Sequence, residues 1–263
     1  MNLETQYRYP DDRDRIALAY AEKHEPFRGY WRRSEDRALS IAERIVRGKK
    51  GLLHQFLDVG CGEGRLLERF AKQSSVVVAI EPDPTRAAAA LEKVWAQGLR
   101  NVQVFQSRVE GAVLPAGTFD AALCSHVIQH ARSDEAQGII QGIHRLLKPK
   151  GFLVLLTTHA RRRDDVFRSV RKEDAVLEKG LTEREFNDLV VNNHGVLPVR
   201  LFSSRSLREL LKEWFSVVRL RVLNSFYPPV FLDRLFFRDR LINLPFVNNY
   251  FGEDVMIVAR KKS

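Results

Sequence analysis

A cluster of glycines behind an acidic residue is the part of this 263-residue sequence best suited to ligand chemistry. Asp58, Gly60, Gly62 and Gly64 lie between an apolar run and a segment with helical spacing of leucines. Glycine adopts backbone angles that other residues avoid, and it lets the backbone approach a ligand closely. A helix that starts there adds unpaired backbone N–H groups. The pattern therefore predicts a ligand-binding turn between a strand and a helix.

The spacing of the glycines distinguishes this turn from two other nucleotide-binding turns. The dinucleotide fingerprint G-x-G-x-x-G would need a glycine at position 65, where the chain has Arg65. A phosphate-binding loop of the form G-x-x-x-x-G-K-S/T is absent from the sequence. Arg65 therefore disfavours an NAD-dependent oxidoreductase, which stays as an alternative enzyme class.

The elements that must position this turn follow from the hydrophobic pattern. Short apolar runs predict strands at 52–59, 76–80, 102–106, 119–125, 152–157, 217–223 and 254–259. Helical patterns lie between them, including one from Asp83-Pro84 to a stop at Gly98 and one that begins near Ser133. Strands that alternate with helices predict βαβ units and a parallel sheet covered on both faces.

Four segments in this order resemble the class I S-adenosylmethionine (SAM)-dependent methyltransferases, over roughly residues 52–158. They are Asp58-x-Gly60-x-Gly62-x-Gly64, Glu81 behind the second strand, Phe119-Asp120 to His130, and Leu146-Leu147-Lys148-Pro149-Lys150-Gly151. The resemblance implies a Rossmann-like α/β fold with a seven-stranded, mostly parallel sheet. Helices would cover both faces, the last strand would be antiparallel, and N-terminal helices and helical insertions would be added.

The resemblance also implies a site for SAM, with S-adenosylhomocysteine (SAH) as product. Glu81 would hold the two ribose hydroxyls, since two carboxylate oxygens match two neighbouring hydroxyls. The family often has an acidic residue near the adenine amine after the third strand, and here Ser107, Arg108 and Val109 take that place. The full set of expected cofactor-binding residues is Asp58, Gly60, Cys61, Gly62, Gly64, Glu81, Pro82, Ser107, Arg108, Val109 and Ser125.

Catalysis of methyl transfer leaves a weak signature, because the sulfonium is already a good leaving group. A general base helps only when the acceptor atom carries a proton. Ligands of open α/β sheets bind at the carboxyl ends of the strands, which nominates His126 and His159 as candidate catalytic bases. Two isolated cysteines, Cys61 and Cys124, give neither a disulfide framework nor a metal-ligand pattern, and they favour a reducing, cytoplasmic setting.

The chain divides into an N-terminal helical cap at 1–50 and a methyltransferase domain at 51–263. Helices are expected at 11–26 and 34–48. The domain carries insertions at 160–202, expected to be irregular or helical with a short helix after Thr182, and at 225–251. The second insertion is rich in aromatic residues, so it is a candidate for a packed cap, a lid over an apolar substrate, or a peripheral membrane contact.

The formal net charge of +10 lies mostly outside the predicted sheet. Residues 51–150 carry 11 basic and 10 acidic residues, so the excess belongs to the rest of the chain. We expect a small, partly hydrophobic or anionic methyl acceptor. The basic periphery, with Arg161–Arg163, leaves RNA as an alternative acceptor, and a non-catalytic scaffold with this fold is a third reading. No stretch is apolar enough to span a bilayer, the N-terminus lacks a secretory signal, and the oligomeric state is not predicted.

Overall fold

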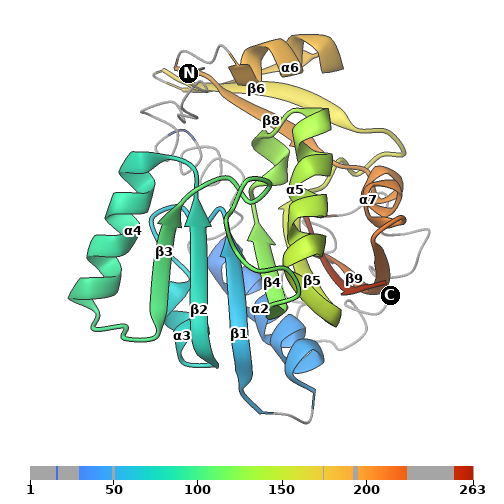
Figure 1. Cartoon of the computed structure of the whole chain (residues 1–263). Coiled ribbons are helices and arrows are strands. Elements are labelled where there is room, and N and C mark those ends of the chain that lie inside the picture. Colours follow the sequence, from blue (N-terminus) through green and yellow to red (C-terminus); the bar gives the residue numbers. More distant parts are fainter. Residues whose placement is uncertain are drawn as a thin grey trace.

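A seven-stranded sheet forms the centre of the computed structural model, which describes residues 16, 30–48, 51–173, 175–191, 195–223 and 252–262. The strand order is β3-β2-β1-β4-β5-β10-β9 (Figure 1). The strands are β1 (Leu53–Val59), β2 (Ser74–Glu81), β3 (Val102–Gln106), β4 (Phe119–Ser125), β5 (Leu147–Thr158), β9 (Phe215–Leu223) and β10 (Asp254–Lys261). All seven predicted strands are therefore present.

The first five strands pair in parallel, and β10 is antiparallel to both β5 and β9. This arrangement confirms the predicted seven-stranded, mostly parallel sheet with an antiparallel last strand. Strand order reverses at β1, which pairs with β2 on one side and β4 on the other. Such a switch point is where open α/β sheets bind ligands, at the carboxyl ends of the strands.

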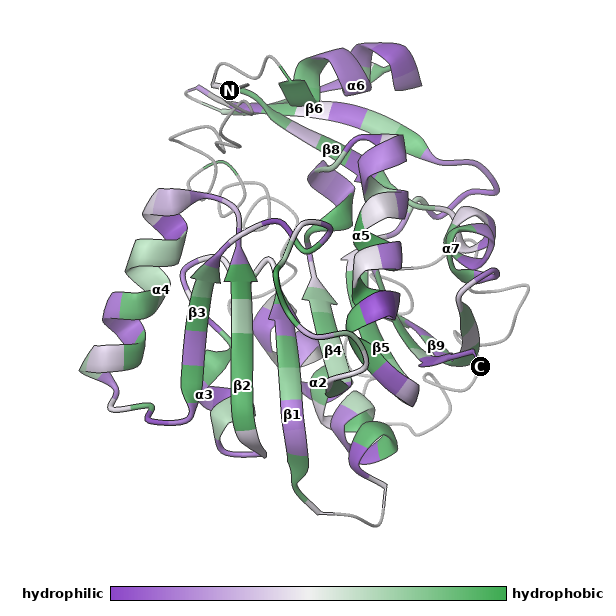
Figure 2. Cartoon of the chain, viewed as in Figure 1, coloured by the Kyte–Doolittle hydropathy of each residue, from purple (hydrophilic) through white to green (hydrophobic). Residues whose placement is uncertain are grey.

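Helices cover both faces of the sheet. On one face lie α5 (Ser133–Leu146) and α7 (Ser204–Leu211), and on the other lie α2 (Tyr30–Arg47), α3 (Leu67–Ala71) and α4 (Pro84–Ala96). Alternate residues of the central strands pack against the two helical layers. Leu57 belongs to the cluster with α5 and α7, whereas Phe56 stacks on Phe70 of α3 with ring centroids 4.2 Å apart. The largely apolar colour of β2 in Figure 2 reflects burial on both faces of the sheet.

The predicted start of α4 is confirmed in atomic detail. The side chain of Asp83 accepts hydrogen bonds from the backbone N–H groups of Thr85 and Arg86, and Pro84 occupies the first helical position. The helix stops before Gly98, whose φ is 62°. This start fixes the chain directly behind Glu81, one of the expected site residues.

The insertion at 160–202 differs from the expected irregular or helical structure. It forms an antiparallel sheet in the order β7-β6-β8, built from β6 (Val166–Lys172), β7 (Val176–Leu181) and β8 (Leu197–Leu201). The helix expected after Thr182 is present as α6 (Glu183–Val191). The strands were not predicted because each is short, and charged residues interrupt the apolar ones in β6 and β7, which gives a weak signal from sequence alone.

The small sheet lies beyond the carboxyl ends of β1, β2 and β4 (Figure 1). A bridge between His159 and Phe202 links it to the end of β5, and its own apolar cluster includes Ile16 and Val170. Of the expected N-terminal helix at 11–26 only Ile16 is described, and the aromatic segment 225–251 lies outside the described residues. Among the helices that the structure describes, none is both long and apolar enough to cross a membrane.

Candidate functional site

The glycine turn behind β1 has a backbone that only glycine accommodates without strain. Gly60, Gly62 and Gly64 have φ values of 69°, 57° and 76°. A Cβ on Gly60 would lie 2.4 Å from Val127 Cγ2, and one on Gly62 would lie 2.4 Å from Arg86 Nη2. The backbone of the turn therefore packs directly against neighbouring side chains, which leaves no room for a Cβ at Gly60 or Gly62.

Glu81 fixes this turn to the end of β2. Its buried carboxylate accepts hydrogen bonds from the N–H groups of Gly62 at 2.9 Å and Asp83 at 3.1 Å, one on each oxygen. The N–H groups of Gly60 and Cys61 both reach the carbonyl of Ile80, at 2.8 and 3.1 Å. Glu81 therefore holds the glycine turn against the end of β2, directly beside the start of α4.

Asp58 is a buried acid beside the same turn. Burial raises its pKa to about 7, the charge of Arg65 opposes the rise, and the charge of Glu81 adds to it. Asp58 is 3% exposed, and the buried hydroxyl of Ser125 at the end of β4 has no hydrogen-bond partner among the described residues. Buried polar groups are normally hydrogen-bonded, so these two fit a site that a polar, cationic ligand completes.

A pocket of about 450 Å³, open to solvent, adjoins the turn. Its walls come from the ends of β1 and β2, the loop after β3, the loop after β4, and α5. The lining residues are Val59, Gly60, Ile80, Pro82, Ser107, Arg108, Val109, Glu110, Val127, Ala131, Glu135 and Ile139.

The structure brings five expected residues to this pocket wall: Gly60, Pro82, Ser107, Arg108 and Val109. The other expected cofactor residues, Asp58, Cys61, Gly62, Gly64, Glu81 and Ser125, belong to the turn and the strand ends rather than to the wall. Cys61 is buried, its thiol donates to the carbonyl of Gly62, and burial raises its pKa, so it contributes packing rather than reactivity.

Sequence reasoning missed the part of the wall that α5 supplies. Glu135 and Ile139 line the pocket, and Glu135 pairs with Arg108 at 2.8 Å on its rim. The sequence feature that bears on this contact between α5 and the loop after β3 is Gly142. A Cβ at that position would lie 3.1 Å from the backbone of Val109. Small residues on one side of α5 therefore let the loop after β3 settle against the helix.

The two candidate bases lie in different surroundings. His159 is fully buried, with Nε2 3.1 Å from Ser204 Oγ and Nδ1 3.3 Å from the carbonyl oxygen of Gly252. Both ring nitrogens are engaged, and these contacts favour a packing role for His159. His126 is only partly buried, has a φ of 56°, and lies where β4 ends, next to Val127 of the pocket wall.

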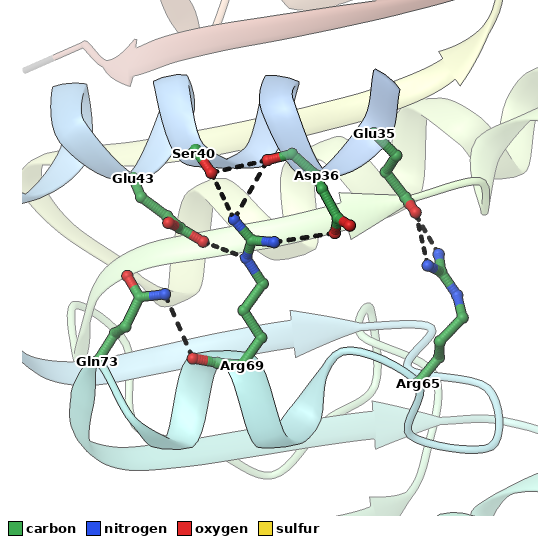
Figure 3. Close-up of polar contacts among 7 residues, drawn as sticks. All are labelled: Glu35, Asp36, Ser40, Glu43, Arg65, Arg69 and Gln73. Atoms are coloured by element: carbon green, nitrogen blue, oxygen red, sulfur yellow. Dashed lines mark hydrogen bonds and ion pairs between the residues drawn. The ribbon is translucent and has the colours of Figure 1, made fainter. Parts of the chain in front are cut away.

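Helix α2 is anchored beside the turn by arginines of the following segment (Figure 3). Arg65 forms two hydrogen bonds with Glu35, at 2.6 and 2.8 Å, and Arg69 contacts Asp36, Ser40 and Glu43. Burial alone would raise the pKa of Glu35, but Arg65, and then the charges of His126 and Arg69, hold it below its usual range. The residue that breaks the dinucleotide fingerprint therefore ties the N-terminal helix to the site.

Comparison with known families agrees with this geometry. A family described as "Methyltransferase domain" matches residues 57–155, which run from within β1 to within β5. The ubiquinone biosynthesis O-methyltransferase of Xanthomonas axonopodis is 37% identical over 101 residues, 38% of this chain and 41% of the relative. That of Rhodopseudomonas palustris is 31% identical over 103 residues, 39% of each chain. The chain thus matches about two fifths of the length of these relatives.

Solved structures share the fold over nearly the whole chain at low identity. The 1,6-didemethyltoxoflavin-N1-methyltransferase of Burkholderia thailandensis, solved with SAH, has a TM-score of 0.55 and 18% identity, covering 99% of this chain and 94% of its own. The N-methyltransferase NodS of Bradyrhizobium japonicum, also solved with SAH, has a TM-score of 0.55 and 13% identity, covering 93% and 97%. At such identities the likeness concerns the fold alone.

Proposed function

Residues 57–155 form a methyltransferase domain of the SAM-dependent class I type, and from this premise we propose that the whole chain transfers a methyl group from SAM to a small-molecule acceptor. One observation carries the proposal. The turn of Gly60, Gly62 and Gly64 is held by the Glu81 carboxylate, and Gly60 of this turn lines an open pocket. That combination suits an adenosyl amino acid, whose sugar offers two neighbouring hydroxyls and whose purine needs a flat apolar slot.

The residues present suit each part of SAM. Glu81 would accept hydrogen bonds from the ribose hydroxyls, and the backbone at 107–109 would flank the adenine, with Ile139 opposite as an apolar wall. The buried carboxylate of Asp58 would face the positive charge of the ligand. When bound, SAM supplies a methyl group on a positively charged sulfur that departs as a neutral thioether. The protein's work is then to align the acceptor and exclude water.

A small acceptor, partly hydrophobic or anionic, is supported by two features. The relatives in sequence are named for ubiquinone biosynthesis, which concerns a small molecule. In addition, the β7-β6-β8 sheet stands beyond the carboxyl ends of the central strands, where it can enclose an acceptor (Figure 1). The burial of Cys61 and Cys124 as free thiols agrees with a cytoplasmic setting.

RNA as acceptor has less support from the structure. Of the basic run at 161–163, Arg161 already pairs with Glu253 at 2.7 Å, while the two following arginines are exposed. A methyl acceptor that is RNA would bind with a steep dependence on salt concentration. RNA therefore enters the test below as a competing acceptor.

The proposal is tested in two stages with the full chain. Isothermal titration calorimetry should show SAH binding and no NAD binding. Methyl-labelled SAM is then offered with catechols, phenolic acids, long-chain phenols, amines, thiols and total RNA, and labelled products are separated. Binding of NAD without SAH, or transfer to RNA alone, would contradict the proposal.

A further inference from the structure

A chain of hydrogen bonds, partly buried at His126 and buried beyond it, connects His126 to the inserted sheet through Gln129 and His130 of the 3₁₀ turn η1 (Ile128–His130). The contacts run from His126 Nδ1 to Gln129 Oε1 at 3.2 Å, from Gln129 Nε2 to His130 Nε2 at 3.3 Å, and from His130 Nδ1 to the carbonyl oxygen of Pro198 at 2.7 Å. Gln129 Oε1 also receives Thr157 Oγ1 and the N–H of Thr158, both at 3.2 Å. Gln129 and His130 are almost fully buried.

The direction of each bond in this chain is fixed by backbone groups at two points. The N–H of Thr158 can only donate, so the Gln129 atom that it meets must be the amide oxygen. The carbonyl of Pro198 can only accept, so Nδ1 of His130 must carry a proton. Nε2 of a neutral His130 then accepts from the Gln129 amide nitrogen, which agrees with the orientation set at the other end.

The same reasoning assigns the tautomer of His126. Because Gln129 Oε1 can only accept, Nδ1 of His126 must be its donor, and Nε2 of the neutral ring is left unprotonated. The ring stands at the carboxyl end of β4, beside Val127, which overlies Gly60. Glu35 of α2, which pairs with Arg65, interacts electrostatically with His126. An imidazole with an unprotonated Nε2 therefore follows β4, next in the chain to Val127 at the glycine turn and within electrostatic reach of Glu35 of α2.

We propose that Gln129 is a positioning residue that holds His126 as the Nδ1–H tautomer, so that Nε2 of His126 accepts the proton of a hydroxyl acceptor. The inference rests on the proposed function and narrows it to acceptors whose nucleophilic oxygen carries a proton. The acceptor oxygen bonds to the methyl carbon as the carbon–sulfur bond breaks, and the sulfur keeps the bonding electron pair. The hydroxyl proton passes to Nε2, and the resulting imidazolium releases a proton to solvent.

The Gln129 oxygen serves both states of this cycle. It accepts the Nδ1 proton from the neutral ring and from the imidazolium alike, so the ring need not turn when it takes up the proton. The inserted sheet takes part at a distance, because Pro198 of β8 orients His130 and thereby Gln129. A purely structural Gln129 would satisfy Thr157 and Thr158 without any consequence for the tautomer of His126.

The tautomer is measured directly by long-range ¹H–¹⁵N correlation spectra of the full ¹⁵N-labelled chain, with and without SAH. His126→Asn identifies the His126 signals, and asparagine tolerates a positive φ, which limits backbone strain. The wild-type spectrum should show His126 protonated on Nδ1. The signals of His54, at the far end of β1, should be the same in every variant and so serve as an internal reference. A wild-type ring protonated on Nε2 overturns the proposal without any variant.

Two substitutions of Gln129 separate positioning from packing. Gln129→Glu keeps an acceptor for His126 and should leave its proton on Nδ1. Gln129→Leu removes the acceptor at similar volume and should shift the ring toward the Nε2–H tautomer. An unchanged His126 tautomer in the leucine variant would show that Gln129 does not set it. Should that variant fail to fold, the wild-type and glutamate spectra still decide.

Measurements of kcat test whether His126 acts as the general base. With catechol as methyl acceptor, His126→Asn should lower kcat by about 10²-fold or more with the KM for SAM unchanged, and Gln129→Leu should reproduce part of that loss. With the more acidic 4-nitrocatechol, whose hydroxyl ionises by itself, both losses should shrink. Transfer to amines or thiols but to no hydroxyl acceptor would overturn the inference. If no compound in the panel were methylated, the proposed function would be overturned instead. The spectra would still show whether Gln129 sets the tautomer of His126.

Discussion

The two sides of the active cleft are built in different ways. The cofactor side is local in sequence: the glycine turn directly follows β1, and Glu81 ends the neighbouring strand. The proposed acceptor side is assembled from distant segments, with Glu35 from α2, Gln129 from η1 and Pro198 from β8. Binding a common ligand thus rests on backbone geometry that short motifs encode. Handling a particular acceptor rests on long-range contacts that can change without disturbing the cofactor.

The largest effect that would challenge this contrast concerns Gly60. Gly60→Ala should cost about 2–4 kcal/mol of unfolding free energy, because it adds strain at positive φ and an overlap with Val127. SAH affinity should fall with it. Urea denaturation and calorimetry measure both quantities. Gly98→Ala is the matched control, since Gly98 has a φ of 62° with open space around it. Equal losses in both variants would mean that close approach at Gly60 is unimportant.

The next effect concerns Glu81. Glu81→Ala should weaken SAH binding by about 1–3 kcal/mol, the scale of a lost charged hydrogen-bond partner, and Asp58→Ala should do the same. Calorimetry of each purified variant measures the change. Thr85→Ala, a change on the neighbouring helix start whose N–H bond to Asp83 is kept, serves as control. If both carboxylate variants bound SAH as tightly as the parent, the proposed SAM site would be wrong.

The raised pKa of Asp58 gives a test of the cofactor side through the pH dependence of stability and binding. Its pKa of about 7 in the folded chain exceeds that in the unfolded chain, so the stability it contributes falls as pH rises from about 4 to about 7. SAM, which is positively charged, favours the ionised carboxylate. Binding just below the pKa of Asp58 should therefore release a proton, seen as a dependence of the calorimetric enthalpy on the buffer. Asp58→Asn should abolish that dependence, and its persistence would assign the proton elsewhere.

The smallest effect lies on the acceptor side. Arg65 is largely exposed, so Arg65→Ala should lower the unfolding free energy by less than about 1 kcal/mol. SAH affinity should hardly change, whereas the KM for the acceptor should rise because α2 loses its tie to the turn. Lys72→Ala, which removes an exposed pair with Glu68 away from α2, is the control. A large loss of SAH affinity in the Arg65 variant would erase the distinction between the two sides.

Much of the cofactor side was predictable from the sequence. The glycine spacing, the strands around it and the capped start of α4 depend on the backbone preferences of nearby residues, and all of these are confirmed. The position of Glu81 at the end of the second strand was predicted from the sequence, whereas its hydrogen bonds to Gly62 and Asp83 were not. Even so, the partners of Arg65 did not follow, because an arginine in a glycine-rich turn says nothing about a helix 30 residues earlier.

The sequence by itself determined the order and type of the central strands, the turn and the acids beside it. Hydrophobic period and glycine conformation act over a few residues and so can be read locally. Only the tertiary structure decided that 160–202 is a sheet, that His159 is enclosed by Ser204 and Gly252, and that Gln129 orients His126. Those outcomes depend on hydrogen bonds between segments up to 93 residues apart, whose geometry exists only once the chain has folded.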